Sequence, residues 1–244
     1  MAICDVSYRG DLFSLSYMQD NIKQPKSILF LHGWGSNKEI MHTNFKNYLS
    51  DFRIISVDMP GFGASKNEES ILTTKDYKNI IEIFLQTIGV EPNVIAGHSF
   101  GGKVATLLQP KCLVLLSSAG ILVPKPFSVK FKIALFKLLK PFGVQKIRRL
   151  FVADDAKKMN HAMYETFKNV VDEEFEDNFK NYQGKALLFW GKSDTATPLW
   201  TAEKIANLIA DSKLYPLDGD HFFFTKHAQF ISNTISQECK DYNG

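Results

Sequence analysis

Six short apolar runs recur along the chain, and each ends in small or turn-forming residues. Continuous apolar strands of this kind are typical of a parallel sheet that is covered on both faces. Helical patterns lie between the runs, the clearest over residues 74–88 with Gly89 as its stop. This alternation predicts an α/β fold with a mostly parallel, doubly wound sheet. The six runs are SILFLHG, RIISVDMPG, NVIAGHS, CLVLLSSAG, KALLFWGKSD and SKLYPLDGDH.

Two parts of the chain depart from this alternation. Near the N-terminus, alternating segments around Val6 and over residues 12–17 predict an antiparallel hairpin about Arg9-Gly10-Asp11. Later, residues 121–183 carry no buried-strand pattern, only helical periodicity broken by prolines and a glycine. We therefore predict an α/β core formed by residues 1–120 and 184–244, with a helical cap inserted at residues 121–183.

Net charge, the length of the apolar runs and the cysteines exclude several classes of protein. A net charge of +3 falls short of the concentrated charge of a nucleic-acid binder, so no nucleic-acid partner is expected. The N-terminus does not resemble a secretory signal, and no stretch approaches the roughly 20 apolar residues of a membrane span. We therefore expect a cytoplasmic protein. Cys4, Cys112 and Cys239 are odd in number and far apart, so we expect reduced thiols and no zinc site.

The pentapeptide Gly97-His98-Ser99-Phe100-Gly101 follows the run NVIA and precedes a helical stretch, GGKVATLLQ. A G-x-S-x-G match alone arises by chance in about a tenth of chains of this length, so its setting decides. Here the setting is strand, turn and helix, in which the glycines leave room for a serine on a sharp, strained turn. The helix N-terminus that follows can also stabilise an anion. Ser99 is the candidate nucleophile.

A serine becomes nucleophilic when an imidazole removes its proton and a carboxylate orients that imidazole. His221 follows the last predicted strand, and Asp194 follows the run ALLFW. Their order, Ser, Asp, His, is that of the G-x-S-x-G hydrolases. Asp220 adjoins His221 in sequence and would struggle to face its ring, so Asp194 is the better candidate acid.

Acyl transfer also requires N–H donors directed at the developing oxyanion. The residue after the nucleophile, Phe100, and the loop His32-Gly33-Trp34-Gly35 are the expected sources, with Trp34 as the second donor. Taken alone, HGWG is also a glycine-rich turn that closes a buried strand. His32 and His98 are expected to be structural, because the triad requires a single imidazole base.

Jointly, HGWG, DMPGFGAS, GHSFGG, WGKSDTATP and GDHFFF, in this order from residue 32 to residue 224, resemble the α/β-hydrolase superfamily of serine hydrolases. The chain is similar to pimeloyl-carrier-protein methyl ester carboxylesterases, which share HGWG, and to meta-cleavage-product hydrolases. The latter usually carry tryptophan just after the catalytic histidine, where Phe222 stands here. Dehalogenases and epoxide hydrolases of this fold use an aspartate nucleophile, which Ser99 argues against, whereas cofactor-free haloperoxidases share the triad.

The motifs and the resemblance predict a serine hydrolase that cleaves the ester or thioester of a small or acyl-chain substrate through an acyl-enzyme. No metal or organic cofactor is expected, since protein groups fill every role. One alternative is hydrolysis of a carbon–carbon bond in a 2-hydroxy-6-oxo-dienoate ring-cleavage product by the same residues. Another is a binding protein of this fold that has lost its chemistry.

The predicted cap has segregated charge and a possible role in binding. Residues 125–149 carry eight lysines and arginines and no acid, whereas residues 154–177 are dominated by acids. The basic stretch is either a solvated surface or a site for an anionic carrier protein or lipid headgroup. Apolar residues near the motifs suggest an apolar pocket. These residues are Trp34, Phe100, Met159, Met163 and Phe222.

Overall fold

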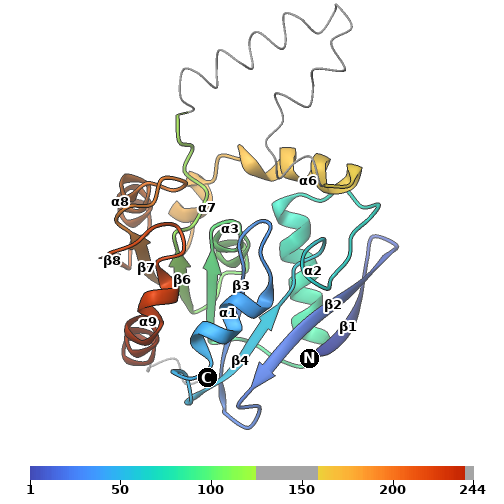
Figure 1. Ribbon diagram of the computed structural model, residues 1–244, viewed down its shortest axis with the longest axis horizontal. Coiled ribbons are helices and arrows are strands. Elements are labelled where there is room, and N and C mark those ends of the chain that lie inside the picture. Colours follow the sequence, from blue (N-terminus) through green and yellow to red (C-terminus); the bar gives the residue numbers. More distant parts are fainter. Residues whose placement is uncertain (125–158, 240–244) are drawn as a thin grey trace, which may run out of the picture.

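A computed structural model of the chain describes residues 1–124 and 159–239. Its centre is an eight-stranded sheet in the order β1-β2-β4-β3-β5-β6-β7-β8 (Figure 1). The six apolar runs form β3 to β8, and neighbouring strands among these six all pair in parallel. The predicted fold class is therefore confirmed. The strands are β1 (Ala2–Tyr8), β2 (Asp11–Asp20), β3 (Lys26–Leu31), β4 (Phe52–Val57), β5 (Val94–His98), β6 (Cys112–Leu116), β7 (Lys185–Gly191) and β8 (Ser212–Leu217).

The predicted hairpin is present and extends further than the sequence pattern indicated. Strands β1 and β2 pair antiparallel, and Arg9 and Gly10 connect them with positive φ angles of 53° and 90°. Two such residues give a turn whose twist matches that of the flanking strands. Strand β2 continues to Asp20 and pairs antiparallel with β4, which joins the hairpin to the parallel sheet.

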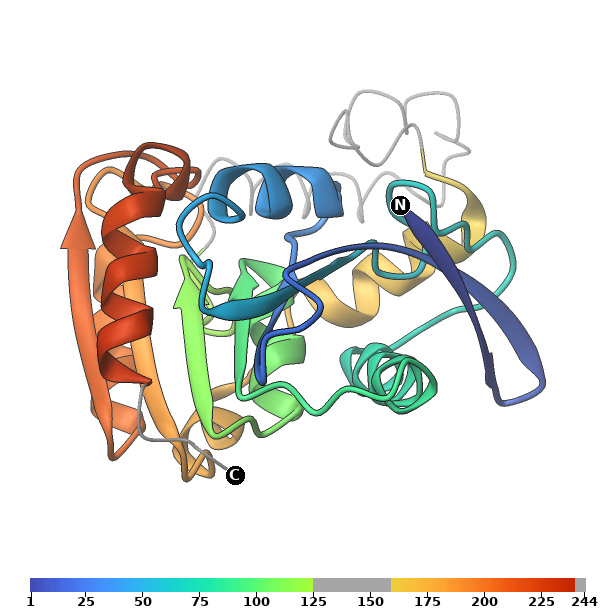
Figure 2. The ribbon, with the colours of Figure 1, turned by 90° about the horizontal axis from the view of Figure 1, so that it is seen from below.

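Helices cover both faces of the sheet, as Figure 2 shows with α1 on one side and α2 on the other. Alternate side chains of one strand enter two separate cores because successive residues point to opposite faces. In β3, Phe30 packs into the core beneath α1 and α9, whereas Leu29 and Leu31 enter the core beneath α2, α3 and α8. The helices are α1 (Lys38–Phe45), α2 (Thr74–Thr87), α3 (Phe100–Leu107), α6 (His161–Val171), α7 (Glu176–Lys180), α8 (Leu199–Leu208) and α9 (Phe224–Glu238).

Helix α2 confirms the clearest helical pattern in the sequence. Thr73 caps its N-terminus by accepting from the Asp76 amide, while the Asp76 side chain accepts from the Thr73 amide. This reciprocal pair satisfies two backbone donors that a helix start leaves open. Gly89, with φ of 66°, ends the helix where the sequence predicted a stop.

The described part of residues 121–183 contains α6 and α7 and no strand. Helix α6 lies across the top of the sheet in Figure 1 and is hydrogen-bonded to the loop between β4 and α2. Thr166 Oγ accepts from the Leu72 amide at 2.9 Å, and Asn160 donates to the Asn67 carbonyl at 2.9 Å. The division into core and cap stays a prediction, and the basic stretch of residues 125–149 lies outside the described residues.

The expectation of three reduced thiols is wrong for two of them. Cys112 in β6 and Cys239 after α9 form a disulfide, with their Cα atoms 6.3 Å apart, and Cys4 is a free, buried thiol. The partners are 127 positions apart in sequence. They meet because both side chains enter the same core on one face of the sheet, which residue spacing alone does not reveal.

Candidate active site

Ser99 lies between β5 and α3 on a strained turn, with φ of 51° and ψ of −116°. The two flanking glycines are required by close backbone contacts. A Cβ atom at Gly97 would lie 2.3 Å from the Gly101 carbonyl oxygen, and one at Gly101 would lie 2.4 Å from the Leu31 carbonyl oxygen. The chain therefore folds as the G-x-S-x-G pattern predicted, with the serine between the carboxyl end of a strand and the start of a helix.

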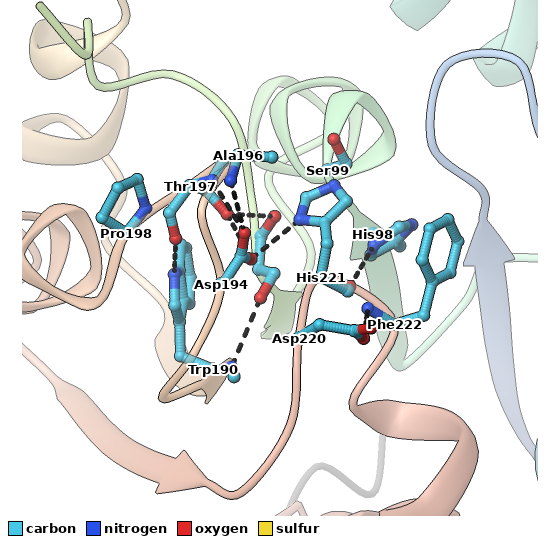
Figure 3. Close-up of polar contacts among 12 residues, drawn as sticks. His98, Ser99, Trp190, Asp194, Ala196, Thr197, Pro198, Asp220, His221 and Phe222 are labelled. Atoms are coloured by element: carbon cyan, nitrogen blue, oxygen red, sulfur yellow. Dashed lines mark hydrogen bonds and ion pairs between the residues drawn. The ribbon is translucent and has the colours of Figure 1, made fainter.

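Asp194 and His221 come together beside this turn. His221 Nδ1 donates to Asp194 Oδ2 at 2.8 Å. The Asp194 side chain is fully buried, whereas that of His221 is 21% exposed. Figure 3 shows the His221 ring between the Asp194 carboxylate and Ser99. The three residues follow β5, β7 and β8, and they meet because parallel strands present their carboxyl ends at one edge of a sheet.

Hydrogen bonds hold Asp194 as an anion. Its Oδ1 accepts from the amides of Ala196 and Thr197 at 2.8 and 3.0 Å, and its Oδ2 accepts from Thr197 Oγ at 2.8 Å. Burial alone would raise the pKa of Asp194, but the hydrogen bonds from His221 and Thr197 outweigh it and lower the pKa to about 2. The carboxylate is thus able to stabilise a positive charge on His221.

Sequence reasoning did not single out two residues that support the acid. Thr197 contributes both its amide and its hydroxyl, and the Trp190 indole N–H fixes its carbonyl at 2.7 Å. Ser117, at the end of β6 with φ of 44°, also hydrogen-bonds to Asp194 and helps to lower its pKa. Thr197 could have been found from the sequence, because a hydroxyl three residues after an aspartate often hydrogen-bonds to it. The role of Ser117 is recognisable only from the tertiary structure.

The loop that contains HGWG packs against Ser99. A Cβ atom at Gly33 would lie 3.1 Å from Ser99 Cβ. His32 holds this loop, because its Nδ1 donates to the Gly33 carbonyl at 2.8 Å and its Nε2 accepts from the Met59 amide at 3.1 Å. His32 is fully buried, in agreement with the structural role expected for it. Trp34 follows in the same loop.

Phe100 is the first residue of α3, so its amide is among those at the helix N-terminus that have no intrahelical partner. The amides of Trp34 and Phe100 thus come from the two segments that meet at Ser99. Their role as oxyanion donors stays a prediction. Asp220 is turned away from the His221 ring, and its Oδ1 accepts from the Phe222 amide at 2.9 Å. Asp194 is therefore the carboxylate that contacts His221 in the structure.

A cavity of about 500 Å³ opens beside the HGWG loop. Of the five apolar residues expected near a pocket, three line it. The other two do not: Phe100 is buried against Trp34, and Phe222 packs on His98. A larger hollow, of about 670 Å³, lies at the amino ends of the strands, at the opposite edge of the sheet from Ser99, Asp194 and His221. The 500 Å³ cavity is lined by Trp34, Gly61, Phe62, Met159, Asn160 and Met163, among others.

Metal and membrane features are absent from the part of the chain that the structure describes. Over residues 1–124 and 159–239, no three His, Cys, Asp or Glu side chains gather as a metal site. Over the same ranges, no helix combines the length and the apolar character needed to cross a bilayer.

The family model described as alpha/beta hydrolase fold matches residues 26–159, which is more than half of the chain. The chain belongs to this family. Its structural neighbours include esterases and hydrolases that act on meta-cleavage products, and hydrolytic activity is the class that fold and family support.

Individual relatives show how far the likeness extends. The AB hydrolase superfamily protein YisY of Bacillus subtilis is 23% identical over 256 residues, covering 89% of this chain and 93% of YisY. The esterase EaEST from Exiguobacterium antarcticum superposes with a TM-score of 0.75 at 20% identity, covering 97% of this chain and 99% of the esterase. The meta-cleavage product hydrolase CumD from Pseudomonas fluorescens gives 0.74 at 15% identity, covering 98% of each chain. At such identities the structural likeness concerns the fold.

Proposed function

We propose that this protein is a serine hydrolase that cleaves a carboxylic ester or thioester through an acyl-enzyme. The observation that carries the proposal is the hydrogen bond of 2.8 Å from His221 to the buried Asp194, on a ring that lies beside Ser99 at its strained turn. A buried carboxylate, an imidazole and a serine in this order form the arrangement that activates a hydroxyl for acyl transfer.

In the acylation step, His221 Nε2 removes the proton of the Ser99 hydroxyl as Oγ bonds to the substrate carbonyl carbon. The electron pair of the carbonyl moves to its oxygen, where the amides of Trp34 and Phe100 stabilise the negative charge. When the intermediate collapses, the alcohol or thiol leaves with the proton from His221. Asp194 stays ionised and stabilises the imidazolium ion, because the pKa of its carboxyl is about 2.

Deacylation repeats these steps with water. His221 takes a proton from water, whose oxygen bonds to the acyl carbon of the acyl-enzyme. The bond to Ser99 Oγ then breaks, the serine regains its proton from His221, and the acid is released. Protein groups perform each proton transfer in this scheme.

The cavity beside the HGWG loop supports an apolar acyl group as the substrate portion bound there. Trp34, Phe62 and the two methionines Met159 and Met163 provide most of its apolar wall. Apolar walls with few polar anchors are typical of small-molecule sites, and methionine adapts to irregular shapes. A small ester or an acyl chain fits this chemistry. An anionic carrier at residues 125–149 stays a separate prediction.

Labelling with a fluorophosphonate tests the nucleophile. We expect the wild-type protein to be labelled and Ser99→Ala to remain unlabelled. Ser14→Ala is the matched control, because Ser14 is an exposed serine of the hairpin that donates to Asp5 at 2.6 Å. A wild-type protein that does not react, or a Ser99→Ala variant that labels equally, contradicts the proposal and favours a binding protein of this fold.

The likeness to CumD keeps carbon–carbon bond hydrolysis as the second candidate. Both reactions use a serine activated in the same way, so labelling does not separate them. Turnover of a 2-hydroxy-6-oxo-dienoate, followed by the loss of its chromophore, is compared with turnover of a panel of aryl esters. If the dienoate is turned over faster than the esters, carbon–carbon bond hydrolysis replaces ester hydrolysis as the proposed reaction.

A further inference from the structure

His98 is a buried side chain beneath the triad that the mechanism above does not use. Its Nε2 lies 3.0 Å from the carbonyl oxygen of His221, and the two ring centroids are 4.7 Å apart. Figure 3 shows this contact on the opposite side of the His221 backbone from Asp194. His221 is therefore held at two points: Asp194 binds its ring, and His98 binds its main chain.

The contact fixes the tautomer of His98. A carbonyl oxygen only accepts hydrogen bonds, so Nε2 must carry the hydrogen. The neutral ring then has its lone pair on Nδ1, which is buried and has no hydrogen-bond partner among the described residues. Nδ1 faces the HGWG loop, since a Cβ atom at Gly33 would lie 2.9 Å from it. One imidazole thus touches the loops of the proposed base and of the proposed oxyanion donors.

His98 is also neutral, which is compatible with a neighbouring base, His221, that becomes positively charged during the proposed reaction. Burial, followed by repulsion from His221, lowers the pKa of His98 to about 3. The ring is therefore neutral at ordinary pH and adds no second positive charge when His221 takes a proton. Its Nε2–H donor remains in place throughout the reaction.

We propose that His98 is a positioning residue, whose Nε2–H bond to the His221 carbonyl fixes the loop after β8 so that the His221 ring faces Ser99. This inference rests on the proposed function, because it assigns His98 a task in the same triad. A loss of this bond leaves the His221 ring attached to Asp194 but frees its backbone, and small misplacements of reacting groups are costly in rate.

Packing and hydrogen bonding can be separated by two substitutions. The His98 ring also packs on Phe222 and Phe224, with centroids 5.2 and 4.9 Å away. His98→Phe keeps an aromatic ring in this contact and removes the donor. His98→Gln removes the ring and places an amide N–H donor near the position of Nε2. A residue that only fills space would be replaced better by phenylalanine, whereas a positioning donor would be replaced better by glutamine.

The experiment compares both variants with the wild-type protein and Ser99→Ala, using p-nitrophenyl ester turnover and the rate of fluorophosphonate labelling. For His98→Phe we expect kcat and the labelling rate to fall about 10–100-fold, with KM within about threefold. For His98→Gln we expect kcat within about fivefold of wild type. A His98→Phe variant within twofold of wild type, or a folded His98→Gln variant as slow as His98→Phe, overturns the proposal.

A measurement on the unmodified chain covers the case in which the variants do not fold. Long-range ¹H–¹⁵N spectra of ¹⁵N-histidine-labelled protein at pH 7 report the tautomer of each ring. A neutral His98 with hydrogen on Nε2 supports the proposal, and hydrogen on Nδ1 overturns it. Failure of the proposed function would be distinct, because the wild-type protein would then neither label nor turn over ester, whatever the tautomer of His98.

Discussion

Asp194 is the residue at which one substitution tests the proposed chemistry of this site. Its two carboxylate oxygens accept hydrogen bonds from His221, Ala196 and Thr197. An amide in its place would lose the negative charge and would have one acceptor oxygen in place of two. In the proposed mechanism the effect of Asp194 is therefore electrostatic and orientational, and a substitution of nearly equal volume can isolate it.

We expect Asp194→Asn to lower kcat by about 10³–10⁴-fold, because His221 loses the charged acceptor that sets its tautomer. Stopped assays with p-nitrophenyl acetate measure the rate, and circular dichroism checks the fold. The matched control is Asp220→Asn, which alters the neighbouring carboxylate that caps the Phe222 amide. We expect the control within about threefold of wild type. A loss below tenfold in Asp194→Asn would move the acid elsewhere.

The neutral state of buried His98 has a consequence for stability in acid. Its pKa in the folded protein is about 3, below the ordinary value of 6.5. Between these two pH values the unfolded chain binds a proton that the folded protein does not, so the free energy of unfolding falls as the pH drops from 6.5 to 3. The same sign applies to buried His32, whose pKa is also lowered by burial.

We expect His98→Gln to reduce this acid sensitivity. The decrease in the free energy of unfolding between pH 7 and pH 4 should be smaller than in wild type by about 2–3 kcal/mol, because glutamine does not titrate. Urea denaturation at the two pH values measures it. Equal decreases in the variant and in the wild-type protein would contradict the neutral state of His98.

Among the elements, α3 and the segment after α6 are joined by an ion pair between a buried lysine and a partly exposed glutamate. Lys103 of α3 contacts Glu173 at 2.5 Å and donates to the Val170 carbonyl at 2.8 Å. Its side chain is 2% exposed, whereas that of Glu173 is 33% exposed. Burial lowers the pKa of Lys103, and Glu173 opposes that shift. Helix α3, which begins directly after Ser99, is thereby attached to the described end of the predicted cap.

We expect Glu173→Gln to lower the free energy of unfolding by about 2–3 kcal/mol, because it leaves a buried ammonium without its counter-charge. Glu165→Gln is the matched control in α6. Glu165 pairs with Lys168 at 2.5 Å, but those side chains are 29% and 49% exposed, so the loss should stay below about 0.5 kcal/mol. Urea denaturation compares the two, and similar losses would show that burial of Lys103 is unimportant.

The elements also show which parts of the structure are predictable from sequence. Strands β3 to β7 were predicted because a strand buried on both faces is largely apolar, a signal that needs no knowledge of its neighbours. The order Ser99, Asp194, His221 was predictable because each residue lies in the loop or turn that follows a strand. The disulfide and the contact of His98 with the His221 carbonyl were not predictable, since they depend on where α9 and the loop after β8 pack. Residues near in space but distant in sequence leave little local signal.

At the scale of the whole molecule, the cavity of about 500 Å³ beside the HGWG loop lies between loops of the sheet and helix α6. The HGWG loop and the loop after β4 form one wall, and α6 with the residues before it forms the other. Met159 lines the cavity and is half-buried, so a larger side chain can replace it with little effect on the core. Substrate size should therefore be adjustable at this position.

We expect Met159→Trp to lower kcat/KM for p-nitrophenyl octanoate by about tenfold while p-nitrophenyl acetate changes less than about twofold, because added volume excludes the longer acyl chain. Met159→Ala should have the opposite effect on the octanoate-to-acetate ratio. Tyr48→Trp, an exposed substitution away from the cavity, serves as the control. An unchanged ratio in both Met159 variants would place the acyl group elsewhere.

The contact between Gly61 and Met163 constrains how such a cavity can change during evolution. A Cβ atom at Gly61 would lie 2.1 Å from Met163 Sδ, and the glycine has φ of 88°. The end of the Met163 side chain is flexible and can move aside, but the positive φ at Gly61 strains any side chain placed there, whichever residue stands at position 163. This wall of the cavity is therefore free to change in evolution at Met163, whereas Gly61 is held as glycine by its backbone conformation.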